Sequence, residues 1–153
     1  METLPVKSPG IGLNRKTKET VVFIICLTCI FLFLSSAYSK LAEHQRFEHG
    51  LQNVDFISSF APFLSWVVPI LEIVIALLLI IPPTFRYGLY SFTALMSLFT
   101  FYIGGMMLWA DKLPCHCNLF IEKLSWRQHL LFNIAFILMA LFALRLSKKF
   151  KKS

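Results

Sequence analysis

A short polar stretch at 113–120, Leu-Pro-Cys-His-Cys-Asn-Leu-Phe, carries residue types that do chemistry. Cys115 and Cys117 are separated by a single residue, so a disulfide between them closes a small ring. That ring is strained, because the disulfide torsion prefers about ±90°. Strained, exposed disulfides are the labile ones that take part in thiol exchange. The spacing therefore indicates thiol–disulfide chemistry, with a static structural bridge as the alternative.

The same stretch offers ligands for a soft metal. Cys115, His116 and Cys117 supply two thiolates and an imidazole, which suit zinc or copper, and His44 and His49 lie in another polar connection. However, adjacent residues rarely point at one metal together, and no second C-x-x-C or H-x-x-x-H pattern completes the ligand set. A zinc- or copper-handling protein stays an alternative, and we assign no residue as a metal ligand.

Glu72 is the one ionisable side chain deep inside an apolar run, and it follows Pro69 by three residues. An intramembrane carboxylate is costly and faces the interior of a helix bundle by default. Two interpretations are open: a functional residue of a proton relay or quinone site, or a protonated carboxyl that hydrogen-bonds a neighbouring helix. The candidate partners at similar depth are Ser97, Thr100, Tyr102 and Asn133.

The other two cysteines, Cys26 and Cys29, form a C-x-x-C inside an apolar run with no strand before it. Soluble redox folds place this spacing beside a strand, whereas buried cysteine usually behaves as a small hydrophobe. We therefore expect these two thiols to pack in the core. Lys40, at the end of the same run, is expected to anchor the helix at the lipid headgroups.

Four apolar runs must position these residues. The hydrophobic fraction is 57% and the charged fraction 15%, whereas soluble domains carry roughly 45–50% and about 25%. A hydrocarbon core of about 30 Å needs roughly 17–25 helical residues, and only helices or closed barrels satisfy their backbone in lipid. The sequence predicts an all-α, polytopic four-helix bundle with spans at about 21–38, 59–81, 88–110 and 128–146.

The distribution of basic residues predicts the orientation. The two tails, the turn at 81–88 and Arg145 at the end of the last span carry ten Lys and Arg residues, and the other two connections carry five. The positive-inside rule therefore places both termini in the cytoplasm and 113–120 outside, which in a bacterial inner membrane is the oxidising periplasmic side. This topology accounts for the net charge of +7. We therefore expect the lipid bilayer as a partner and no nucleic acid.

The remaining organisation follows from these spans. We expect a mobile cytoplasmic tail at 1–19, a membrane domain at 20–147 and a basic cytoplasmic tail at 148–153. Between the first two spans, Phe47, Leu51 and Val54 recur at helical spacing, which predicts a short amphipathic helix. Gly104 and Gly105 are expected to permit close helix contact in the third span.

Together these features resemble the MauE/DoxX group of small four-helix membrane proteins. Three motifs carry the resemblance in order over roughly 21–146: S-A-x-x-K-L at Ser36–Leu41, P-x-x-E at Pro69–Glu72, and the C-x-C before the last span. In that group Phe-Gly usually follows the cysteine pair, whereas Asn118 and Leu119 stand here.

The resemblance implies a role in periplasmic thiol–disulfide chemistry, such as forming disulfides in exported partners during maturation of methylamine dehydrogenase. It carries over to Cys115, Cys117, Glu72 and Lys40. We expect a thiol–disulfide oxidoreductase activity toward a thioredoxin-like protein or exported substrate, with a quinone near Glu72 as a candidate electron carrier. The alternative is a non-catalytic assembly subunit in which Cys115 and Cys117 form a structural bridge.

Overall fold

The computed structural model describes residues 14–109 and 126–150 of the chain, and the ordered elements in these ranges are all helices. Five α-helices and one short 3-10 helix follow in order: α1 (Arg15–Ala42), α2 (His44–Gln52), η1 (Ser58–Phe60), α3 (Ala61–Ile80), α4 (Phe85–Trp109) and α5 (Trp126–Phe150). The predicted all-α class is confirmed, as is the predicted helix between the first two spans.

Four segments in the described part of the chain are long and apolar enough to cross a membrane: Arg15–Ala42, Ser58–Ile80, Phe85–Leu108 and Arg127–Lys148. Each coincides with one predicted span, and the protein is a multi-pass membrane protein. The first helix starts at Arg15 rather than near 21, so it includes polar residues that precede the apolar run. Residues 1–13 of the predicted tail lie outside the described residues.

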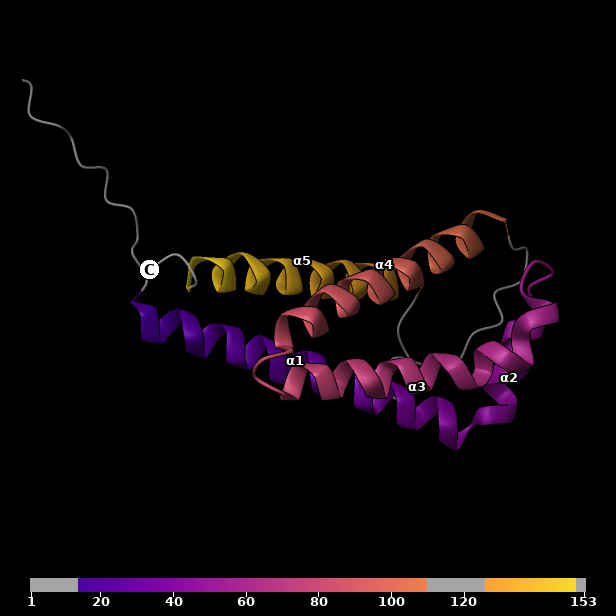
Figure 1. Ribbon diagram of the computed structural model, residues 1–153. Coiled ribbons are helices and arrows are strands. Elements are labelled where there is room, and N and C mark those ends of the chain that lie inside the picture. Colours follow the sequence, from indigo (N-terminus) through magenta and orange to yellow (C-terminus); the bar gives the residue numbers. More distant parts are fainter. Residues whose placement is uncertain (1–13, 110–125, 151–153) are drawn as a thin grey trace, which may run out of the picture.

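The four long helices pack in the cyclic order α1, α3, α4, α5. The most extensive contacts join α1 to α3 and α4 to α5, while α3 packs on α4 and α5 returns to α1. Figure 1 shows that the start of α1 and the end of α5 lie at the same end of the bundle. The opposite end holds α2, the start of α3 and the end of α4, and is called the α2 end below.

The short helix α2 packs against α3 through its apolar face. Phe47 and Leu51 are buried against Ala61, with Leu64 and Val68 beside them. The helical spacing of the two α2 residues explains why both reach the same surface. The predicted amphipathic helix therefore uses its apolar side to contact protein, and it fixes the chain that joins α1 to α3.

The connection between α3 and α4 is a tight turn at the other end of the bundle. The Thr84 hydroxyl donates to the Leu78 carbonyl at 3.0 Å, which ties the turn to the end of α3. A Cβ built on Gly88 would lie 2.9 Å from the Leu79 backbone nitrogen, so only glycine fits this approach. Arg86 in the first turn of α4 donates to the Ser147 carbonyl near the end of α5.

Gly104 and Gly105 do not have the role expected of them. A Cβ on either residue would meet no described heavy atom within 4 Å, whereas Gly88 is in close contact with α3. The prediction of close helix contact at the glycine pair is therefore wrong for the described residues. The close contact occurs instead at Gly88, beside the turn that joins α3 to α4.

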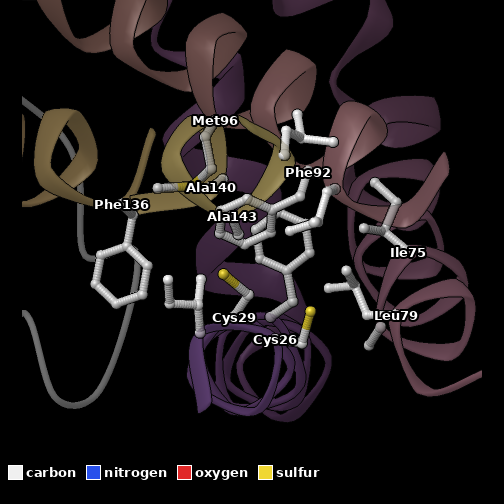
Figure 2. Close-up of a cluster of buried hydrophobic side chains, with 14 of the residues drawn as sticks. Cys26, Cys29, Ile75, Leu79, Phe92, Met96, Phe136, Ala140 and Ala143 are labelled. Atoms are coloured by element: carbon white, nitrogen blue, oxygen red, sulfur yellow. The ribbon is translucent and has the colours of Figure 1, made fainter. Parts of the chain in front are cut away.

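The main apolar core lies between α1, α3, α4 and α5, and Cys26 and Cys29 are part of it. Figure 2 shows both sulfur atoms pointing from α1 into a cluster that includes Phe92 and Leu79. Cys29 has no exposed surface, and both cysteines are free thiols. The structure confirms that this C-x-x-C packs as two small hydrophobes.

Replacing Cys29 by alanine is expected to lower the free energy of unfolding by roughly 0.5–3 kcal/mol, because it removes a fully buried sulfur from the core. Chemical denaturation of the purified protein in detergent measures this loss. Thr28→Ala, one residue away on the exposed face of α1, is the matched control and should change stability little. Loss of thiol exchange at unchanged stability would contradict the packing role.

Candidate functional site

Glu72 lies in a buried polar cluster between α1 and α3. Its side chain is 0% exposed and its Oε1 atom accepts two hydrogen bonds, from the Ser36 hydroxyl at 3.0 Å and from Lys40 Nζ at 2.7 Å. Lys40 also donates to the Ser36 hydroxyl oxygen. The three side chains therefore form a closed triangle of hydrogen bonds that contains one ion pair.

Helix geometry explains why these three residues meet. Ser36 and Lys40 are four residues apart and so lie on the same face of α1, which is the face that packs on α3. On α3, Pro69 and Glu72 are three residues apart, and both are fully buried. The first two motifs of the family resemblance thus come together at a single point in the fold.

Aromatic rings cover the ammonium group of Lys40 from two other helices. Its Nζ atom lies 5.7 Å from the centre of the Phe47 ring of α2 and 5.5 Å from that of Phe99 of α4. Ring faces attract a cation, most strongly where water is excluded. Lys40 of α1 therefore contacts side chains of three other helices, and its charge is balanced by one carboxylate and two ring faces.

The predicted partners of Glu72 are wrong. Ser97 and Thr100 donate their hydroxyls to carbonyls of their own helix, each at 2.7 Å. Neither Tyr102 nor Asn133 hydrogen-bonds Glu72, although Asn133 is buried on α5. Ser36 and Lys40 of α1 take their place, because α3 has its most extensive contacts with α1.

Lys40 was expected at the headgroups, but only 7% of its side chain is exposed and it pairs with Glu72. One signal in the sequence pointed to this arrangement. The second span contains the carboxylate of Glu72, and Lys40 lies near the end of the first span. Consecutive spans run antiparallel, so the end of the first span lies beside the first half of the second. Because a lone intramembrane charge is costly, the two oppositely charged groups satisfy one another.

Cys115, His116 and Cys117 lie outside the described residues, so the predicted pair has no geometry here. Within 14–109 and 126–150 no three His, Cys, Asp or Glu side chains are grouped to hold a metal ion. The two histidines weighed as extra ligands have other contacts. His44 stacks on Trp66 with ring centres 4.3 Å apart, and the His49 side chain is hydrogen-bonded to the Gln52 side chain at 3.2 Å.

The family is settled by sequence comparison. The family model described as "Methylamine utilisation protein MauE" matches residues 18–146, which is most of the chain. The chain belongs to the MauE family. Comparisons with curated proteins and with solved structures give no match. The MauE match spans α1 to α5 and includes Ser36, Lys40 and Glu72, so the buried cluster lies within the region that defines this family of methylamine-utilisation membrane proteins.

Proposed function

We propose that this MauE-family protein is a thiol–disulfide exchange protein of the bacterial inner membrane. Cys115 and Cys117 are the exchanging pair, and the partner is a periplasmic thioredoxin-like protein or an exported substrate. The observation that carries the proposal is the separation of the four cysteines. Cys26 and Cys29 are locked in the apolar core between four helices, so exchange with an outside partner falls to the other pair.

The topology supports this assignment of roles. The connection from Trp109 to Trp126 joins the end of α4 to the start of α5, and by the distribution of Lys and Arg it faces the periplasm. That compartment keeps thiols oxidised. A C-x-C pair in this connection is therefore reachable by soluble partners, whereas the Cys26 and Cys29 thiols are inside the membrane domain.

The exchange itself balances without a further reactant. The thiolate of one cysteine attacks a disulfide of the partner, forming a mixed disulfide and releasing one partner thiolate, which takes up a proton. The second cysteine loses its proton and attacks the mixed disulfide. The Cys115–Cys117 disulfide forms, and the second partner sulfur leaves as a thiol. Run in reverse, the same steps oxidise the partner.

Thiol trapping in membranes tests the proposal. Membranes are acid-quenched and alkylated, and wild type is compared with Cys115→Ala and Cys117→Ala. We expect one single variant to accumulate a mixed disulfide, because its remaining cysteine attacks but cannot be resolved. The Cys26→Ala/Cys29→Ala variant is the control and should exchange normally.

Two outcomes would contradict thiol exchange. One is a redox state of Cys115 and Cys117 that stays fixed while the oxidant supply is varied, with no mixed disulfide in either single variant. This result would leave a structural bridge in an assembly subunit. The other is zinc or copper that copurifies with wild type and is lost from both single variants, which would assign the pair to a metal.

A further inference from the structure

We propose that the Ser36–Lys40–Glu72 cluster is a proton-binding site, in which Glu72 Oε2 takes up and releases a proton inside the membrane domain. The two carboxylate oxygens of Glu72 have different surroundings. Oε1 accepts hydrogen bonds from Ser36 and Lys40, whereas Oε2 is buried and has no hydrogen-bond partner among the described residues. A buried carboxylate oxygen without a donor is unusual and costly.

The geometry allows Oε2 to bind a proton without the loss of either hydrogen bond of the cluster. Both donors of the cluster are directed at Oε1, so protonation of Oε2 breaks neither hydrogen bond. Oε1 then acts as the carbonyl oxygen of a neutral carboxyl group and continues to accept from Ser36 and Lys40. The proton also removes a charge from an oxygen that has no donor to stabilise it.

Protonation changes the net charge of the cluster from zero to one positive charge, which remains on Lys40. The rings of Phe47 and Phe99 stabilise this charge, since the Lys40 Nζ atom lies within 6 Å of both ring centres. Their attraction for a cation persists when Glu72 becomes neutral. Aliphatic side chains in the same places would leave the ammonium with its hydrogen bonds to Ser36 and Glu72 but without this attraction.

Other titratable side chains lie on the helices around the cluster. From α5, His129 is half-buried and interacts electrostatically with Lys40. From α4, Tyr102 is half-buried and lies one turn beyond Phe99. From α2, His44 stacks on Trp66 of α3 and lies 4.0 Å from Glu48. Lys40 is two residues from the end of α1, so the Lys40–Glu72 hydrogen bond joins Glu72 to a residue near that end.

Thiol–disulfide exchange moves protons on and off sulfur, and a proton site within the membrane domain would serve it. That use rests on the proposed function, whereas proton binding at Glu72 does not. The experiment is therefore run in both wild type and a Cys115→Ala/Cys117→Ala variant. An unchanged titration in the variant is expected, and it keeps the two proposals separate.

Infrared spectroscopy of the protein in bilayers tests the site while the pH is stepped from alkaline to acid. We expect a protonated-carboxyl band that appears on acidification, shifts in deuterated buffer and is absent from Glu72→Gln. Glu19→Gln, an exposed residue paired with Arg15, should retain the band. Glu72→Asp keeps a carboxyl and should show a displaced band, which guards against misfolding of the glutamine variant.

The ring faces supply a second measurement. Phe99→Leu should weaken proton binding, by no more than the roughly 30-fold that a whole cation–ring interaction of about 2 kcal/mol corresponds to. Only the part of the attraction that is gained when Glu72 becomes neutral changes the proton affinity. Phe101→Leu, at an exposed position of the same helix, should leave it unchanged. Identical infrared titrations for wild type, Glu72→Gln and Phe99→Leu would overturn the proposal.

Discussion

Replacing Lys40 by methionine is expected to lower the free energy of unfolding by about 3–5 kcal/mol, the usual cost of leaving one partner of a buried ion pair alone. Glu72 would keep only the Ser36 hydroxyl as a donor, in a site where its side chain is fully buried. The two ring faces of Phe47 and Phe99 would lose their cation. Denaturation of the purified protein in detergent, followed by circular dichroism, measures the loss.

The double variant Lys40→Met/Glu72→Leu is the informative comparison. A buried pair replaced by apolar side chains of similar volume is often neutral or stabilising, so we expect the double variant to recover most of the stability lost in the single one. Lys16→Met changes an exposed lysine of the same helix and controls for charge alone. A Lys40→Met loss no greater than that of Lys16→Met would contradict the ion pair.

Gly88→Ala is expected to destabilise the protein by about 1–3 kcal/mol, as overpacking of a close contact does. The added Cβ would lie 2.9 Å from the Leu79 nitrogen and 3.0 Å from the Leu78 carbonyl carbon. Both are backbone atoms, which cannot move aside as a flexible side chain would. The start of α4 would therefore have to move away from α3, and the midpoint of thermal unfolding should fall.

Gly105→Ala in the same helix separates this clash from the general effect of alanine. A Cβ there meets no described atom within 4 Å, and alanine favours a helix over glycine by up to about 1 kcal/mol. We expect this variant to be neutral or slightly more stable than wild type. Equal losses of stability in Gly88→Ala and Gly105→Ala would mean that the close contact of α4 with α3 is not the reason that position 88 requires glycine.

The four spans could be predicted from the sequence because length and apolarity are properties of each helix alone. The helix ends could not be predicted as well, since α1 continues to Arg15 through polar residues. Gly88 illustrates a further limit. A glycine close to two prolines indicates a turn in the sequence, but only the packing of α3 on α4 shows that Gly88 lies inside α4 and contacts the backbone of α3.

The candidate site was predicted in part. Burial of Glu72 follows from the cost of a carboxylate in lipid, and the helical positions of Ser36 and Lys40 can be read from their spacing. The contact of these two residues with Glu72 cannot be predicted from the sequence, because it depends on which helix packs beside α3. Ser97 and Thr100 were equally suitable by depth, and they bond their own helix instead.

The Lys40–Glu72 pair also has a consequence for the order in which the protein is made. The chain emerges from its N-terminal end, and both charges belong to the first two membrane helices, α1 and α3. The pair can close while α4 and α5 are still being synthesised, so the membrane never has to hold either charge alone for long. The apolar face of α1 around Cys29 is different, since its neighbours include residues of α5, which are made after α1, α3 and α4. That face therefore has to wait for α5 before its packing is complete.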